Sequence, residues 1–322
     1  MLRAVTSVMD SSPRGLRDQQ VVFQAVEGTE LANPSRDSKL VQGEQMKSSY
    51  QPDAVMEYFD DLGEREWERM IRTPADEAGL YIHTHYLKKH ISSNEKILEI
   101  GAGPGRFTQI LAALDARVLV TDISSRQLNL NRKYSRTYGF DRAIIDWKQM
   151  DICDMSELDS ESFDAVVAYG GVFSYVLDKK DIALSESIRV LKPGGIMLLS
   201  VMSLWGTAHG FLDAVISLAA EVNQRIIATG DITPATSPDR RGNFMHLFRA
   251  HELLGWLEKA GLIVLDRSAA NCLSLTWNEE LKVIRANAEK WDELLRMELE
   301  ACAEDGCLNM GTHIIVAAQK PC

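Results

Sequence analysis

The sequence predicts an α/β fold in which a doubly wound, mostly parallel sheet of seven strands carries helices on both faces. Three observations predict this fold. Short apolar runs alternate with helical stretches, several runs end in glycine or acidic residues, and 45% of the 322 residues are apolar while 25% are charged. Such a composition is typical of a globular protein with a buried core. N-terminal lid helices precede the sheet, and helical insertions are expected after strands five and six.

The composition changes near residue 48. Residues 1–48 are rich in Ser, Arg, Asp, Gln and Glu and show little apolar periodicity. Such a segment cannot bury enough apolar surface to offset its ordering entropy, so we expect a mobile leader. The remaining residues, 49–322, are expected to form one domain. Within it we expect lid helices over 53–92, a ligand-binding core over 96–201 and a substrate-covering insertion over 202–250.

The stretch ahead of the first strand shows the helical spacing of apolar side chains. Pro74 should divide it into two helices, with Thr73 as the N-cap of the second. His83, His85 and His90 fall on this second helix, at offsets that do not converge on one metal ion. We therefore expect these histidines at the surface and no metal site.

Seven apolar runs predict the strands. In chain order they cover residues 96–100, 117–121, 144–150, 165–169, 196–201, 262–267 and 312–318. The helices between them are expected over about 107–114, 124–138, 181–190, 211–220, 251–259 and 278–302, with no clear strand in 205–250. The LKPGG run over 191–195 is expected to be a turn into the fifth strand. Because right-handed crossovers place the carboxyl ends of parallel strands at one edge, a ligand site is expected there.

Charge and composition exclude several classes of protein. The formal net charge of −11, from 35 basic and 46 acidic residues, argues against a broad electrostatic grip on nucleic acid. No window reaches about 18 uninterrupted apolar residues, so no membrane-spanning helix is expected. The five cysteines show neither a disulfide framework nor metal-ligand spacing, which favours a reducing, cytoplasmic location.

The strongest local signal is the run LEIGAGPG over residues 98–105, between the first strand and the following helix. Glycines at such a junction let the backbone approach a ligand without an intervening Cβ. A dinucleotide-binding fingerprint would need a glycine at position 106, which is Arg106. The loop alone is compatible with a ligand site or with a simple turn.

Further residues stand at the ends of the other strands. Asp122 ends the second strand, where a carboxylate can accept hydrogen bonds from both hydroxyls of a ribose. Asp151 and Ile152 follow the third strand, where they can bracket an adenine ring. Tyr169, ahead of two glycines, ends the fourth. Taken singly, Glu99 and Asp122 are also compatible with a capping role, but their common edge favours an adenosine-containing ligand.

Together these residues resemble the class I S-adenosylmethionine-dependent methyltransferases of the small-molecule type. The resemblance covers about residues 53–320, is most specific over 96–201, and implies a seventh strand antiparallel to the rest, with S-adenosyl-L-methionine as cofactor. One departure is the long helical segment between strands six and seven. The resemblance implies that Glu99, Gly101, Gly103 and Gly105 hold the methionine portion, Asp122 the ribose, and Asp151 and Ile152 the adenine. Tyr169 is implied to lie beside methionine and substrate, and Ile123 is expected to be a further cofactor contact.

Methyl transfer is an in-line displacement at an activated carbon, so alignment alone can supply about 7–11 kcal/mol of the barrier reduction. A base is needed only for an acceptor that is protonated at working pH. His246, whose ordinary pKa suits proton transfer, is the candidate catalytic residue. Tyr58, Trp205 and His209 are candidate substrate contacts. The structural alternatives are a core position for Tyr58, a solvated loop position for His209 and a hydrogen-bonded structural role for His246.

The sequence therefore predicts methylation of an O or N atom of a small natural product or metabolite, in secondary metabolism, without a nucleic-acid or membrane partner. The fourth strand lacks the Asn/Asp-Pro-Pro-Tyr/Phe run that resembles base-amine or glutamine methyltransferases. Two alternatives remain. One is a non-catalytic S-adenosylmethionine-binding partner protein, and the other is a nicotinamide-dependent oxidoreductase, which Arg106 and the 191–195 turn disfavour.

Overall fold

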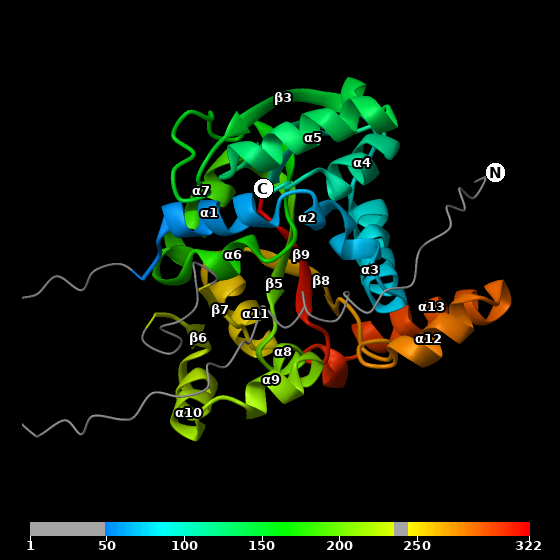
Figure 1. The fold of residues 1–322 in the computed structure, drawn as a ribbon. Coiled ribbons are helices and arrows are strands. Elements are labelled where there is room, and N and C mark those ends of the chain that lie inside the picture. Colours follow the sequence, from blue (N-terminus) through cyan, green and yellow to red (C-terminus); the bar gives the residue numbers. More distant parts are fainter. Residues whose placement is uncertain (1–48, 235–243) are drawn as a thin grey trace, which may run out of the picture.

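Seven strands form one sheet in the order β3-β2-β1-β4-β5-β9-β8 (Figure 1). The computed structural model describes residues 49–234 and 244–322, so the expected leader over 1–48 lies outside the described residues. The strands are β1 (Lys96–Ile100), β2 (Arg117–Asp122), β3 (Ile144–Gln149), β4 (Phe163–Ala168), β5 (Leu191–Met202), β8 (Ile263–Ala269) and β9 (His313–Gln319). The pairs are parallel except that β9 runs antiparallel to β5 and β8. The predicted mostly parallel sheet is confirmed.

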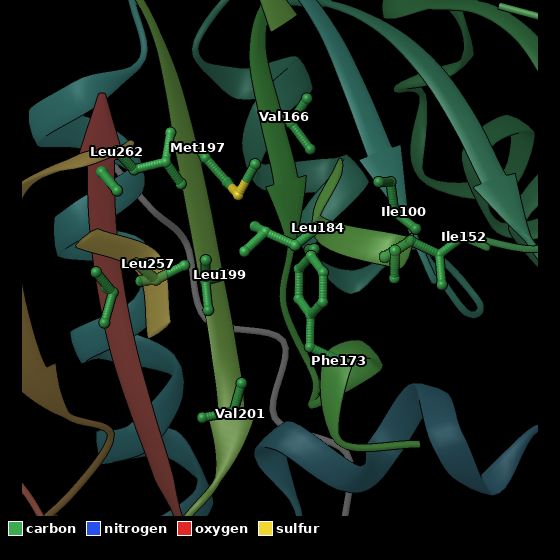
Figure 2. Packing of buried hydrophobic residues seen from close by; sticks show 14 of the residues in the cluster. Ile100, Ile152, Val166, Phe173, Leu184, Met197, Leu199, Val201, Leu257 and Leu262 are labelled. Atoms are coloured by element: carbon green, nitrogen blue, oxygen red, sulfur yellow. The ribbon is translucent and has the colours of Figure 1, made fainter. Parts of the chain in front are cut away.

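Helices cover both faces of this sheet (Figure 1). One face carries α3 (Pro74–His90), α4 (Arg106–Ala113), α5 (Ser125–Tyr138) and α13 (Ala288–Ala303), and the other carries α6 (Val172–Tyr175), α7 (Lys180–Val190) and α11 (Ala250–Lys259). Strand side chains alternate between the faces, so each face builds its own apolar cluster. Figure 2 shows the second of these clusters, in which Phe173 and Leu184 from the helices join Val166 and Met197 from the strands.

Two short helices and a 3₁₀ turn precede α3 and form the lid segment. They are α1 (Pro52–Leu62), α2 (Arg65–Glu68) and η2 (Arg69–Ile71). The predicted break at Pro74 is confirmed, because Thr73 caps α3. Its hydroxyl accepts a hydrogen bond from the Asp76 amide at 3.2 Å, and the Asp76 carboxylate accepts one from the Thr73 amide at 3.0 Å. This reciprocal capping box fixes where α3 begins.

The insertion after β5 differs from its prediction. It contains α8 (Leu204–Gly210), α9 (Leu212–Ile216), α10 (Ala220–Thr229) and the two-residue strands β6 (Asp231–Ile232) and β7 (Met245–His246). The single helix expected over 211–220 is wrong, because α9 ends at Ile216 and α10 begins only at Ala220. The expectation of no strand in 205–250 is also wrong. Strands of two residues are too short to show a period-two pattern in sequence.

Two further boundaries differ from the prediction. The 191–195 run is a bulge inside β5 rather than a turn ahead of it, since Leu191 pairs with Phe163 and Ile196 with Ala165. The long helix expected over 278–302 is two helices, α12 (Asn278–Arg285) and α13. The side chain of Asn287 accepts a hydrogen bond from the Lys290 amide at 3.0 Å and so caps α13.

The prediction that the α3 histidines are surface residues is wrong for His83. Its side chain is only 2% exposed, and its Nδ1 donates to the Gly79 carbonyl at 2.7 Å. His85 and His90 are half-buried, and His90 Nε2 lies 2.6 Å from Asp266 Oδ2. The reason is that His83 lies on the face of α3 that packs on the sheet, where its ring centroid is 4.8 Å from that of Tyr169 and 5.4 Å from that of Phe107.

The described residues contain neither a metal-binding cluster nor a membrane-spanning helix. Within 49–234 and 244–322, no group of three or more His, Cys, Asp or Glu side chains is arranged to hold a metal ion. No helix in the same ranges is long and apolar enough to cross a membrane.

Candidate active site

A pocket opens at the carboxyl edge of the sheet, beneath the lid segment. Its floor is made by the glycine loop after β1 and by the residues that follow β2, β3 and β4, and its roof by side chains from the lid segment. The space within its walls is about 860 Å³, counted out to open solvent. The pocket lies where the topology predicts a ligand site.

The three glycines of the loop have different roles. Gly101, Gly103 and Gly105 all have a positive φ, of 64°, 54° and 102°, which L side chains rarely adopt. A Cβ at Gly101 would collide with the Val172 side chain, and one at Gly105 would stand 2.8 Å from Asn131 Nδ2. At Gly103 the nearest atom is Glu66 Cγ at 3.8 Å, so a side chain there would project into the pocket. Gly105 does not line the pocket, whereas Gly101 and Gly103 do.

Asp122 connects the end of β2 to the glycine loop. Its Oδ2 accepts a hydrogen bond from the Gly103 amide and its Oδ1 one from the Ser124 amide, both at 2.8 Å. The side chain is buried, and burial raises the pKa of the carboxyl to about 6. Asp122 and its neighbour Ile123 both line the pocket. The carboxylate therefore fixes the loop and faces the cavity at the same time.

Glu99 lies behind the loop rather than in the pocket wall. It is 2% exposed, and its Oε2 accepts a hydrogen bond from the Thr108 hydroxyl at 2.7 Å. Its Oε1 is buried without a hydrogen-bond partner in the described residues. Burial raises the pKa of this carboxyl to about 8, and the nearby charge of Asp122 adds to the effect. Glu99 is placed to hold the loop in position from outside the pocket, through its hydrogen bond to Thr108 of α4.

The ends of β3 and β4 supply the other two walls. Asp151 and Ile152 line the pocket, and Asp151 Oδ1 accepts a hydrogen bond from the Cys153 amide at 2.8 Å. Tyr169 lines the pocket at the end of β4, with its ring centroid 5.1 Å from that of Phe107. The Tyr169 hydroxyl is buried and makes no hydrogen bond to a described residue. The structure therefore brings the residues expected at the ends of β1, β2, β3 and β4 to one cavity.

The expected substrate contacts are not brought there. Tyr58 is half-buried and does not line the pocket, whereas its neighbour Phe59 does. Trp205 is 45% exposed and lines a separate, apolar hollow between α8, α9 and α10. His209 is exposed on α8. The insertion after β5 therefore does not place these two side chains against the glycine loop.

His246 is not in the pocket either. Its Nδ1 lies 2.6 Å from Asp231 Oδ1, and its Nε2 lies 2.7 Å from Glu252 Oε1. Burial lowers the pKa of the imidazole, but the two carboxylates outweigh burial and the pKa is raised. With both nitrogens occupied, His246 ties the β6–β7 hairpin to α11. This arrangement fits the structural alternative rather than a base in the reaction.

Sequence reasoning missed two charged residues of the pocket. Glu66 and Arg69 belong to the lid segment, line the pocket and form an ion pair with 2.7 Å between Arg69 Nε and Glu66 Oε1. Opposite charges three residues apart are common on exposed helix surfaces, so the spacing alone gives no signal. Only the fold of the lid over the sheet edge shows that the pair faces a cavity.

Comparison with known proteins agrees with this architecture. Residues 98–199, which run from β1 to β5, match the family model described as a methyltransferase domain. A demethylmenaquinone methyltransferase from Clavibacter sepedonicus is 36% identical over 111 residues, which cover 34% of this chain and 42% of that protein. The chain thus spans less than half the length of this relative.

Two other relatives are matched over most of their length. A ubiquinone biosynthesis O-methyltransferase from Stutzerimonas stutzeri is 25% identical over 72% of this chain and 90% of that protein. A tRNA 5-carboxymethoxyuridine methyltransferase from Escherichia coli (strain K12) is 20% identical over 70% of this chain and 80% of that protein.

The strand order, the glycine loop and the matched segment define a Rossmann-like fold that carries a methyltransferase domain. Over residues 98–199 the chain is similar to the class I S-adenosylmethionine-dependent methyltransferases.

Proposed function

We propose that the pocket under the lid segment is the site of methyl transfer, and that the acceptor is an O or N atom of a small molecule. The observation that carries the proposal is the 2.8 Å hydrogen bond from the Gly103 amide to Asp122. It places the open face of the loop and the acid after β2 on one wall of one cavity. A nucleoside lying along this wall meets the loop, the acid and Ile152 in turn.

The residues present fit S-adenosylmethionine. The open face of Gly103 is a cradle that any side chain would fill, and the Asp122 carboxylate suits the two hydroxyls of a ribose. We assign direct cofactor contacts to Gly101, Gly103, Asp122, Ile123, Asp151, Ile152 and Tyr169. Glu99 and Gly105 lie outside the pocket lining, and we assign them the positioning of the loop.

The cofactor supplies a methyl group activated by a sulfonium, so the chain has to align the acceptor and exclude water. Apolar side chains from the lid and the sheet edge, including Phe59, Met70 and Phe107, line the pocket and suit this task. The lining carboxylate Glu66, which is not assigned to the cofactor, is the group that can receive a proton from the acceptor.

A small acceptor fits the charge of the pocket better than a nucleic acid. The charged lining residues are two arginines and three acids, namely Arg69, Arg106, Glu66, Asp122 and Asp151. Nucleic-acid sites need a surplus of basic side chains along the path of the phosphates. The names of the two relatives from quinone biosynthesis indicate small acceptors, and that of the tRNA relative makes RNA the competitor to test.

We place the reaction in secondary metabolism and in the cytoplasm. All five cysteines lie in the described residues as free thiols. Unpaired thiols of this number are typical of a reducing compartment.

The test is transfer of labelled methyl groups from S-adenosylmethionine to two pools offered in parallel. One pool is a small-molecule extract together with a panel of phenols and amines, and the other is total tRNA. We expect label in the small-molecule pool only. Label in tRNA, absent when Asp122→Asn replaces the wild type, would overturn the assignment of a small acceptor while keeping the site.

A further inference from the structure

The Glu66–Arg69 pair holds a cation in the pocket that the proposed cofactor contacts do not use. Glu66 lies in α2 and Arg69 in η2, and both line the pocket. The pair joins only the Nε atom of Arg69 to Glu66, at 2.7 Å. In residues 49–234 and 244–322, neither terminal nitrogen of Arg69 has a hydrogen bond or an ion pair. The outer edge of the guanidinium fork is therefore unengaged by this part of the chain.

Arg69 keeps its charge in this setting. Its side chain is 35% exposed although it lies among pocket residues, so part of it faces the cavity. Burial disfavours the charged form, but the Glu66 carboxylate outweighs burial, and the pKa of Arg69 stays above its ordinary value. A cation with unengaged donors in a partly desolvated pocket favours an anionic ligand.

The neighbours of Arg69 place its charge beside Tyr169, at the end of β4, and away from Asp122. A Cβ built on Gly170, which follows β4, would stand 3.7 Å from Arg69 Nη2. His83 and His313, from α3 and β9, have pKa values lowered by burial and by the Arg69 charge. The guanidinium thus lies over β4 and towards β9. Asp122, by contrast, is the last residue of β2, and β1 separates β2 from β4 in the sheet.

We propose that Arg69 binds a carboxylate of the acceptor, so that the enzyme methylates small molecules that carry a carboxylic acid. The inference rests on the proposed function, because it takes Asp122 and the loop as the cofactor side. The planar fork of arginine matches a carboxylate with two parallel hydrogen bonds. A monoanion suits the pocket better than a phosphate dianion, since Glu66 already takes part of the Arg69 charge and Asp122 and Asp151 line the same cavity.

The methionine part of the cofactor also carries a carboxylate that Arg69 could bind. Comparing two cofactor analogues distinguishes this carboxylate from that of the acceptor. S-adenosylhomocysteine contains this carboxylate, whereas 5′-methylthioadenosine lacks the whole amino-acid part. If Arg69 serves the acceptor, Arg69→Met changes the affinity for both compounds by less than twofold. A tenfold loss for S-adenosylhomocysteine with no loss for 5′-methylthioadenosine would assign Arg69 to the cofactor and overturn the proposal.

The acceptor side is tested with a matched pair of probes, salicylate and salicylamide, which differ in the charge of one group. Each is titrated calorimetrically into the full chain loaded with S-adenosylhomocysteine. We expect the wild type to bind salicylate at least tenfold more tightly than salicylamide. The preference should persist in Arg72→Met, whose exposed side chain does not line the pocket, and disappear in Arg69→Met.

Two further variants distinguish the effect of the planar guanidinium group from the effect of its charge alone. Arg69→Met leaves Glu66 uncompensated, which by itself repels an anion. The double variant Glu66→Gln/Arg69→Met removes both charges, and we expect it to show no preference either. Arg69→Lys keeps the charge without the fork, so an intermediate preference is expected.

Binding of S-adenosylhomocysteine, measured in the same calorimetric experiment, distinguishes failure of the carboxylate proposal from failure of the proposed cofactor site. Equal affinity of the wild type for both probes, or no binding of salicylate at millimolar concentration while S-adenosylhomocysteine binds, overturns the carboxylate proposal alone. Recovery of the preference in the double variant also overturns it, because repulsion by Glu66 would then explain the effect. Failure to bind S-adenosylhomocysteine would contradict the proposed site itself.

Discussion

The glycine loop and the β6–β7 hairpin both bury charged side chains, but they satisfy them differently. Under the loop, Glu99 leaves one buried oxygen without a partner in the described residues, and its pKa is raised by burial to about 8. In the hairpin, His246 has a carboxylate on each ring nitrogen, Asp231 on one and Glu252 on the other. One region retains an unsatisfied polar atom, and the other forms a closed network.

This difference helps to distinguish a ligand-binding site from a network that only stabilises the fold. A fully satisfied buried network stabilises the fold and offers nothing to a ligand. Buried acids with raised pKa values beside a cavity are typical of functional sites. By this criterion Asp122 and Glu99 belong to the machinery of the pocket, whereas His246, for all its suitable chemistry, belongs to the insertion's framework.

The largest effect is expected from Gly103→Val, which should abolish binding of S-adenosylhomocysteine. The new side chain would occupy the open space above the loop, where the nearest present atom is 3.8 Å away. Gly139→Val is the matched control, because Gly139 also has a positive φ, of 74°, but does not line the pocket. Both variants carry similar backbone strain, of about 1–2 kcal/mol. Calorimetric titration should show binding in the control only, and equal loss in both would mean that strain explains the effect.

A smaller loss of affinity is expected from Asp122→Asn. Removing the charge weakens hydrogen bonds to the ribose and to the Gly103 amide, which should cost about 1.5–3 kcal/mol, or roughly tenfold to hundredfold in affinity. Asp164→Asn is the control. Asp164 also accepts a hydrogen bond from a main-chain amide, that of Lys96 at 2.8 Å, but it lies near the start of β4 and does not line the pocket. Unchanged affinity in Asp122→Asn would remove Asp122 from the cofactor site.

His246→Gln should affect stability instead of affinity. Two hydrogen bonds to carboxylates are lost, so the free energy of unfolding should fall by roughly 1–3 kcal/mol. The folded-state pKa of His246 is raised, so this stabilisation is fully present below the ordinary pKa and is lost as pH rises through the folded-state value. Urea denaturation should therefore show a larger difference from wild type at pH 6 than at pH 8.5. Loss of turnover at unchanged stability would return His246 to the reaction.

The smallest effect concerns the pH dependence that Glu99 imposes. Its pKa is raised from 4.5 to about 8 in the folded chain, so the folded state retains a proton that the unfolded state has lost. The contribution of Glu99 to stability is present below pH 4.5 and is lost as pH rises towards 8. Compared with Glu99→Gln, the wild type should lose roughly 1 kcal/mol of unfolding free energy between pH 5 and pH 6. Parallel stability profiles for the two proteins would show that Glu99 is ionised in the folded state.

The sheet and its loop could be predicted from the sequence because they are encoded locally. β1 spans the predicted residues, and Thr73 caps α3 as its spacing indicates. The acids after β2 and β3 reach the pocket because parallel strands end at one edge, a rule that needs only strand order. The bulge over 191–195 escaped prediction because its proline and glycines are equally typical of a turn.

The residues that reach the pocket from outside the sheet could not be predicted in this way. Which face of the lid points inwards depends on how α1 and α2 pack, so the sequence could not show that Phe59 and Arg69 line the pocket and Tyr58 does not. The structural role of His246 could not be predicted for a related reason. Its partners Asp231 and Glu252 flank it in the chain, but only the hairpin shows that both ring nitrogens are occupied.

The central claim is that the cofactor lies along the glycine loop, and hydrogen exchange with and without S-adenosylhomocysteine tests it most directly. We expect added protection in peptides covering 99–106, 122–124 and 150–153, and none in peptides covering 204–216 of the insertion. Protection confined to the insertion, with the loop amides unchanged, would contradict the assignment of the pocket.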